Sequence, residues 1–166
     1  MQKIETKRLI LRSFTVADWQ DFQELGLDWK AAPGPDFDKW QTSEEASRES
    51  VEYMATADNY YAVCLRETGK VIGLLGINVV DAEGRLDLGH VILSIYQDND
   101  IDREALQAII THCFATYDIQ AVITHNAPEH AAQLAPLLSL GFANLNPADE
   151  GELVLSKDDW RRLQVR

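Results

Sequence analysis

The chain has 166 residues, 46% of them hydrophobic and 25% charged, so we expect one domain over 1–166 with its own core rather than two domains or a disordered chain. Its formal net charge of −12 repels phosphate backbones, which disfavours a nucleic-acid partner and favours a cationic one. No apolar run is long enough to span a bilayer and no apolar signal segment follows Met1, so we expect a cytoplasmic protein with no membrane partner.

The first third of the chain contains one strand pattern and two helix patterns. Residues 7–13 form an apolar run bounded by charge, which predicts a strand. A capping-box pattern at 15–18 predicts a helix that stops near Gly26, and a full capping box at 42–45 predicts a second helix. The segment 27–41 between them contains two prolines and a glycine and is predicted to be a loop.

The rest of the chain begins with three strand patterns joined by short glycine-containing turns, which predict an antiparallel meander. A helical period of about 3.6 residues follows, then a short buried strand, a helix that ends at Gly141 and two closing strands. In chain order these are strands over 60–66, 71–80 and 85–95, a helix over 105–114, a strand over 121–124, a helix over 129–140, and strands from Phe142 and over 152–155, with Ser156 as the cap of a final helical turn. The order predicts an α+β (mixed α/β) fold, in which one mixed central sheet carries helices on both faces.

Four short segments together form a family signature. Residues 6–12 read TKRLILR, 87–91 read DLGHV, 140–142 read LGF and 155–160 read LSKDDW. In this order they resemble the GNAT superfamily of acetyltransferases, and within it the branch of the ribosomal-protein alanine N-acetyltransferases. The resemblance implies the GNAT acyl-CoA N-acyltransferase fold. It also implies transfer of an acetyl group from acetyl-CoA to a primary amine, either a protein N-terminus or a small amine.

The resemblance also implies where the coenzyme would bind. In this family the pantetheine arm lies between two splayed parallel strands, here 86–95 and 120–125, and the helix between them directs its N-terminal amides at the pyrophosphate. The turn before that helix, 96–105, reads YQDNDIDREA, where a typical member reads YQGKGYATEA. The cofactor-binding positions that follow from this alignment are Gln97, Asp98, Asn99, Asp100, Ile101, Asp102 and Arg103.

Aspartates have replaced small residues in this turn. Asp98 and Asp100 stand where the family has glycine, which lets the backbone approach the phosphates, and Asp102 replaces another small residue. A carboxylate about 4 Å from a phosphate charge costs on the order of several kcal/mol at a protein-surface dielectric, whereas one helix terminus contributes roughly 0.3 to 2 kcal/mol. We therefore expect acetyl-CoA binding to be weakened or lost. The alternative is that these acids cap the helix, with Asp102 as N-cap, so that the protein's own carboxylates occupy the anion site.

Metal binding receives little support from the sequence. Cys64 and Cys113 lie in apolar runs without metal-ligand spacing, so we expect buried, reduced thiols and no metal site. The spacing of Asp98, Asp100 and Asp102 resembles the start of an EF-hand loop, but that motif needs glycine at its sixth position, where Arg103 stands. Binding of another cation by this acidic turn stays an open alternative.

Two residues are candidates for the base that must remove a proton from an acceptor ammonium. Asp87 stands where the branch often has Glu, on the strand that faces the acceptor, and His90 stands at its aromatic position. The alternatives are an ordinary exposed strand acid for Asp87 and a half-buried packing histidine for His90.

Three aromatic residues, Trp29, Phe37 and Trp40, lie in the predicted loop over 27–41. They form either an apolar acceptor pocket, with Trp29 and Trp40 as its candidates, or a loop packed on the sheet. Two functions therefore stay open. One is acetyl transfer to a primary amine, for which the net charge favours a cationic acceptor, and the other is a catalytically inactive GNAT-fold domain used for binding or assembly. A homodimer is compatible with either.

Overall fold

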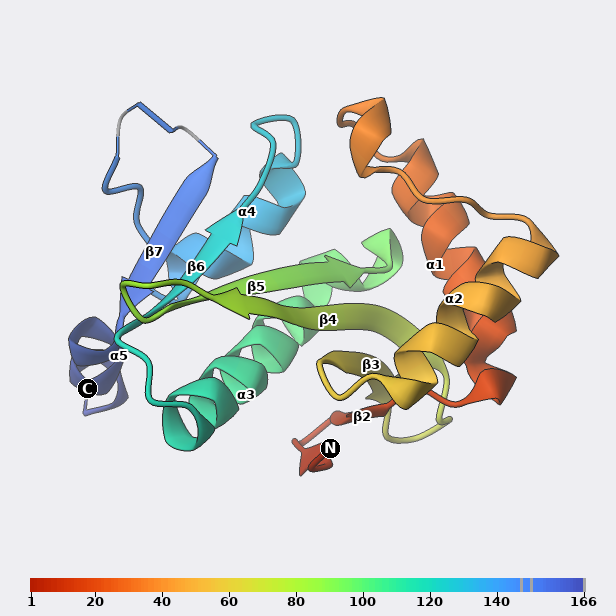
Figure 1. Ribbon diagram of the computed structural model, residues 1–166, viewed down its shortest axis with the longest axis horizontal. Coiled ribbons are helices and arrows are strands. Elements are labelled where there is room, and N and C mark those ends of the chain that lie inside the picture. Colours follow the sequence, from red (N-terminus) through yellow and green to blue (C-terminus); the bar gives the residue numbers. More distant parts are fainter. Residues whose placement is uncertain (147, 150, 166) are drawn as a thin grey trace.

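A computed structural model of the protein describes residues 1–146, 148–149 and 151–165, with the side chains of Asp98 and Asn99 outside the described part. One seven-stranded sheet has the order β1-β2-β3-β4-β5-β6-β7, and all neighbours pair antiparallel except β5 and β6, which are parallel (Figure 1). The strands are β1 (Ile4–Glu5), β2 (Leu9–Ser13), β3 (Tyr60–Leu65), β4 (Val71–Val80), β5 (Arg85–Ile92), β6 (Ala121–His125) and β7 (Glu152–Ser156). The mixed sheet predicted from the sequence is confirmed.

Helices connect the strands in the described part of the chain. The α-helices are α1 (Trp19–Ala31), α2 (Glu44–Thr56), α3 (Ile101–Thr116), α4 (Ala131–Ser139) and α5 (Lys157–Gln164). The short 3-10 helices are η1 (Val16–Asp18), η2 (Asp36–Asp38) and η3 (Ser94–Asn99). The helix α3 forms the crossover between the two parallel strands β5 and β6.

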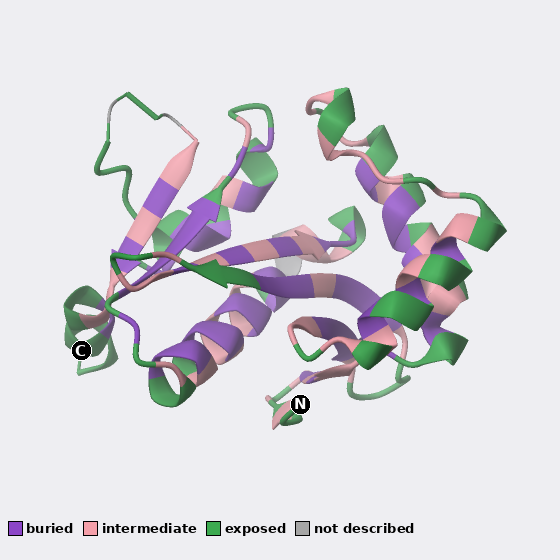
Figure 2. Ribbon diagram, in the orientation of Figure 1, coloured by how far each residue is buried: buried purple, intermediate pink, exposed green. Residues whose placement is uncertain are grey.

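Helices cover both faces of the sheet. The contacts of two successive β3 side chains indicate which helices lie on which face. Tyr61 lies in one buried cluster with the apolar side chains of α3, whereas its neighbour Ala62 lies in a second cluster with Phe22 of α1 and Met54 of α2. Because successive side chains of a strand point to opposite faces, α3 covers one face and α1 and α2 cover the other. Figure 2 shows the buried residues along the central strands and as a stripe along α3.

The helix α1 is longer than the sequence predicted. It continues to Ala31 instead of stopping near Gly26, because Leu25 and Trp29 extend its buried face. Gly26 lies inside the helix, where a Cβ would stand 2.4 Å from Nε1 of Trp40. The glycine therefore makes room for Trp40 and does not end the helix.

Capping residues begin the first two helical segments much as expected. The Asp18 carboxylate accepts the Thr15 amide at 2.7 Å, which completes the first capping box. At α2 the cap is Ser43, whose Oγ accepts the Ala46 amide at 3.1 Å, so this helix begins one residue later than a box at 42–45 predicts.

The end of the chain differs from the prediction in one respect. Gly141 follows α4 with a φ of 95°, as its predicted place at the helix end requires, and Ser156 caps α5. Of the two predicted closing strands, the one over 152–155 is confirmed as β7, whereas the one from Phe142 is only a bridge between Ala143 and Val154, because the chain then leaves the sheet in a loop held by Asn144.

A polar cluster around Glu104, which we call the α3 lock, joins the first strands to α3. The Glu104 carboxylate accepts hydrogen bonds from Thr6 Oγ1 at 2.5 Å, from the Arg8 amide at 2.8 Å and from Arg8 Nε at 2.6 Å. Burial opposes ionisation of this carboxyl, but the hydrogen bonds from Thr6 and Arg8 hold the pKa of Glu104 below its ordinary value. These bonds also turn the chain between β1 and β2, so the strand predicted from residue 7 begins at Leu9.

The cysteines are buried and unbonded, as the sequence predicts. Burial raises the pKa of the Cys64 thiol to about 11 and that of Cys113 to about 12. None of the described helices combines the length and the hydrophobicity needed to cross a lipid bilayer.

Candidate active site

The parallel strands β5 and β6 separate part-way along their length. The paired residues of β5 and β6 run from Arg85 with Ala121 to Asp87 with Ile123. Beyond that point β5 continues to Ile92 and β6 to His125 without pairing to each other. The family resemblance implied such a splayed pair over 86–95 and 120–125. Unpaired strand edges offer backbone groups to an extended ligand that lies along them.

Three adjoining cavities follow this opening from the last paired residues to the start of α3. The apex cavity has a volume of about 200 Å³ and reaches His125, the middle cavity has about 370 Å³, and the loop cavity has about 240 Å³ and reaches Asp102. Shared lining residues join them: Trp29, His130 and Gln133 between the apex and middle cavities, and Gln97 and Ala132 between the middle and loop cavities. The three cavities therefore form one continuous path along the opening.

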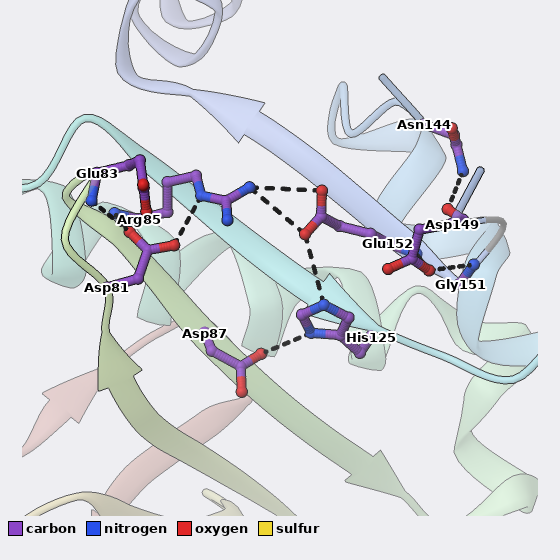
Figure 3. Close-up of polar contacts among 9 residues, drawn as sticks. All are labelled: Asp81, Glu83, Arg85, Asp87, His125, Asn144, Asp149, Gly151 and Glu152. Atoms are coloured by element: carbon purple, nitrogen blue, oxygen red, sulfur yellow. Dashed lines mark hydrogen bonds and ion pairs between the residues drawn. The ribbon is translucent and has the colours of Figure 1, made fainter. Parts of the chain in front are cut away.

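A row of polar side chains, the apex cluster, crosses β5, β6 and β7 beside the apex cavity (Figure 3). His125 lies between two carboxylates, with Nδ1 3.4 Å from Asp87 Oδ1 and Nε2 3.5 Å from Glu152 Oε2. Asn78 of β4 donates to the other Asp87 oxygen at 2.9 Å, and Nη1 of Arg85 lies 3.4 Å from Glu152. Two carboxylates therefore face the imidazole of His125 from either side.

The second candidate base, His90, has different surroundings from Asp87. Three positions along a strand separate the two residues, so their side chains point to opposite faces of the sheet. His90 is buried, and its Nε2 has no hydrogen-bond partner in the part of the chain that the structure describes. Burial lowers the pKa of His90 to about 4, which keeps the imidazole neutral at pH 7. Because His90 also lines the apex cavity, its role as base or as packing residue stays a prediction.

The two tryptophans line the apex cavity, but they come from different elements. Trp29 belongs to α1 and not to a loop, because α1 extends past its predicted end. Trp40 follows η2 and stacks on Trp29 with a ring-centroid distance of 6.3 Å. Phe37 is 86% exposed. Trp29 and Trp40 therefore line a cavity and pack on each other, and their part in acceptor binding stays a prediction.

The wall opposite these tryptophans comes from the start of α4. Gln133 donates through Nε2 to the His90 carbonyl at 3.4 Å, beside the unpaired part of β5. The His130 ring lies 4.5 Å from the Trp29 ring. Gly34 packs against His130: its φ is 141°, and a Cβ would stand 2.0 Å from His130 Nε2. Only glycine lets the loop close on this histidine.

The acidic turn enters α3 with a backbone conformation that favours glycine. Asp100, which stands where the family has glycine, has a φ of 56°, and no other described non-glycine residue has a positive φ. Asp100 is the N-cap of α3 but its side chain makes no capping bond, so the expectation that Asp102 is the N-cap is wrong. Asp102 lies in the first helical turn, only 4% exposed, because its Oδ1 accepts the Arg103 amide at 2.7 Å.

The remaining predicted coenzyme residues surround this turn. Ile101 is buried in the core, so only its backbone faces the turn. Gln97 donates to the Ile92 carbonyl at 3.2 Å, and Arg103 Nε donates to Ser139 Oγ at 3.2 Å. The side chains of Asp98 and Asn99 lie outside the described residues.

One group of side chains approaches the arrangement of a metal site. His125, Asp149 and Glu152 each offer a ligand atom, and these atoms lie within 4.8 Å of one another. However, Asp149 Oδ1 already accepts the amides of Gly151 and Glu152 at 3.2 Å each, and Glu152 faces the Arg85 guanidinium. Because protein donors already pair with both carboxylates, we assign no metal to them.

Sequence reasoning missed His125 and Glu152. A lone histidine after the apolar run over 121–124 gives no motif, and Asp87 is 38 positions away in the chain. The available signal was the strand period: residue 125 shares a face with Ile123, and pairing of Ile123 with Asp87 brings His125 to the carboxylate.

Comparison with known proteins gives a consistent family. A model of the acetyltransferase (GNAT) domain matches residues 8–143 of this chain. An uncharacterized N-acetyltransferase, p20 from Bacillus licheniformis, is 26% identical over 151 residues, which cover 86% of this chain and 83% of that protein.

Solved structures share the fold at lower identity. A GNAT-family acetyltransferase from Bacillus anthracis has a TM-score of 0.81 at 18% identity and covers 95% of this chain and 99% of that one. A ribosomal L7/L12 α-N-protein acetyltransferase in complex with coenzyme A has a TM-score of 0.74 at 19% identity and covers 95% of this chain and 99% of that one.

Proposed function

Because this chain belongs to the GNAT family of acetyltransferases, we propose that it transfers an acetyl group from acetyl-CoA to a primary amine in the opening between β5 and β6. The observation that carries the proposal is the continuous path of the apex, middle and loop cavities along that opening. When bound, acetyl-CoA supplies an acetyl group activated as a thioester.

The unpaired part of β5 suits the amide-containing arm of the donor. The backbone of residues 88–92 has no partner strand on the β6 side, so it can pair with an extended chain as a further strand would. The His90 carbonyl accepts only a long bond of 3.4 Å from Gln133, which a stronger donor can displace. Trp29 and His130 flank the path and exclude water from it.

The far end of the path suits a diphosphate poorly. Asp28 and Glu129 line the middle cavity, Asp100 and Asp102 line the loop cavity, and Arg103 is the one Lys or Arg among the described lining residues. The Arg103 amide, which would otherwise face an anion at the helix start, is already bonded to Asp102. We therefore propose that acetyl-CoA binds, but more weakly than a glycine-rich turn would allow.

The acceptor end suits a cationic amine. Asp38 lines the apex cavity, and Asp87 and Glu152 flank His125 beside it. Asp87 belongs to the apex cluster, which takes up the proton of the acceptor ammonium. Trp29 and Trp40 hold the apolar part of the acceptor. His90 also lines the apex cavity, but burial lowers its pKa to about 4, so we assign it no part in taking up the ammonium proton.

The test is turnover of the full chain with acetyl-CoA and matched amines. We expect release of coenzyme A that depends on the amine, with kcat/KM larger for a diamine than for an amino acid of similar length. Calorimetry with acetyl-CoA should detect binding heat in the same preparation. No heat at millimolar acetyl-CoA, together with no amine-dependent release, would contradict the proposal and favour a binding or assembly domain.

A further inference from the structure

His125 lies where the opening between β5 and β6 begins. It ends β6, two positions after Ile123, the last β6 residue paired with β5. Residues two apart on a strand share a face, so His125 and Asp87 point to the same side of the sheet. On its other side, His125 is paired in register with Glu152 of β7. The three residues therefore form a row across the sheet, on the face opposite to His90.

The contacts of the imidazole leave it accessible. Its side chain is 51% exposed and lines the apex cavity, and its two nitrogens lie 3.4 Å and 3.5 Å from the carboxylates of Asp87 and Glu152 (Figure 3). Both distances are longer than a strong charge-assisted hydrogen bond of about 2.7–2.9 Å. The ring is thus positioned by two carboxylates without being closed off by them.

The described charged groups around the ring are mostly negative. Asp87 contributes from β5, Glu152 from β7 and Asp149 from the loop before β7, while Asp38 lines the same cavity from η2. Two described cations lie near this cluster: Arg85 pairs with Asp81 at 2.7 Å and faces Glu152, and Lys39 Nζ lies 4.5 Å from the ring centroid of Trp29, which lines the same cavity. The described surroundings of the ring therefore carry mostly negative charge, which favours a cationic acceptor beside it.

We propose that His125 accepts the proton that the acceptor ammonium must lose before acetyl transfer, and that Asp87 is a positioning residue for this histidine. The inference rests on the proposed function and adds its proton acceptor. Imidazole is the side chain whose ordinary pKa lies closest to neutral pH, which suits it to this task.

The ammonium gives one proton to the unprotonated ring nitrogen of His125, which becomes an imidazolium with an N–H directed at each of Asp87 and Glu152. The freed amine lone pair forms the bond to the acetyl carbon as the carbon–sulfur bond breaks. The second amine proton goes to the departing thiolate, and the imidazolium returns its proton to solvent through its exposed edge.

The test compares pH profiles of kcat/KM for the full chain and for H125Q, with a diamine as acceptor. We expect H125Q to lose about 10²-fold in kcat/KM at pH 7 and to lose the rise of the profile near neutral pH. Acetyl-CoA affinity measured by calorimetry should change less than about twofold, since His125 lies at the opposite end of the path from the loop cavity. H125N serves as a second variant, and its unfolding in urea checks that the fold is kept.

Two further variants separate roles. D87N should keep the rise of the profile and lose less kcat/KM than H125Q, because the histidine remains and only one of its two neighbouring carboxylates is neutralised. H112Q, which changes a histidine of α3 that contacts Tyr61 away from the cavities, should leave the profile unchanged. Wild-type activity without loss in H125Q would overturn this inference alone, whereas a wild type that acetylates no amine would overturn the proposed function and this inference with it.

Discussion

The two ends of the opening between β5 and β6 both carry carboxylates, but they hold them differently. At the apex, Asp87 and Glu152 lie on either side of His125, with Asn78 and Arg85 as further partners. At the start of α3, Asp100 has no capping bond and Asp102 is bonded to the amide next to it. In the proposed reaction, charge of the same sign would attract an acceptor ammonium at the apex and repel a coenzyme diphosphate at the loop.

The largest expected effect concerns the α3 lock. Glu104 is an acid of the first turn of α3, but unlike Asp100 its carboxylate is bonded to other side chains and holds the fold together. Replacing Glu104 with Ala should lower the free energy of unfolding by about 3 kcal/mol, because Thr6 and Arg8 lose their shared acceptor. Urea unfolding measures this change. E104Q, which keeps part of the hydrogen bonding, should lose less.

The same residue predicts a pH dependence with a definite sign. Because the folded pKa of Glu104 is lowered, its contribution to stability is complete above the ordinary glutamate pKa and is lost as pH falls through the folded pKa. Wild type should therefore lose stability toward acid more steeply than E104Q. Parallel curves for the two proteins would show that the lock contributes no such term.

The next largest effect concerns the acidic turn, where substitutions remove carboxylates at the coenzyme end of the opening. D98G/D100G should tighten acetyl-CoA binding about 10-fold, because two carboxylates are removed from the turn before α3. D98N/D100N removes the charge and keeps a residue that tolerates the positive φ of Asp100, so it isolates the electrostatic part. Calorimetry measures both affinities.

A charge-matched control removes two acids elsewhere. D58N/D118N makes the same change in net charge at exposed positions away from the three cavities, so it should leave the coenzyme affinity nearly unchanged. Equal tightening in this control would show that net charge matters and that the turn does not. Unchanged affinity in D98G/D100G would contradict the role assigned to the turn.

Salt should produce the smallest effect, with opposite signs at the two ends. Raising ionic strength from about 0.05 M to about 0.5 M shortens the Debye length severalfold and screens exposed charges. The KM for a diamine should rise about threefold, whereas the Kd for acetyl-CoA should stay level or fall. Initial rates and calorimetry at each salt concentration test this, and a parallel rise of both constants would contradict it.

Local sequence patterns predicted most of the fold, and the errors of this prediction have physical causes. The bounds of β4, Val71–Val80, were predicted from its apolar run and flanking turns. The end of α1 was not, because the close packing of Trp40 on Gly26 is a tertiary contact that the chain near Gly26 does not encode. The strand expected at Phe142 is one bridge, since Asn144 holds the loop that leaves the sheet.

The candidate site was predicted in part, for a related reason. Asp87 and the acidic turn were found because they stand at positions of a recognisable family pattern. His125 was not, because its meaning depends on the register of β5, β6 and β7, which joins residues far apart in the chain. The backbone conformation of Asp100 also needed the structure, since the sequence indicated only that a glycine had been replaced.

A crystal structure with bound coenzyme A would test the account most directly, through the positions of its sulfur and its diphosphate. We expect the sulfur to lie in the apex cavity on the side of His125. We expect the diphosphate to be displaced from the first-turn amides of α3 by Asp100 and Asp102. A diphosphate bound directly on those amides, or a coenzyme lying outside the opening between β5 and β6, would contradict it.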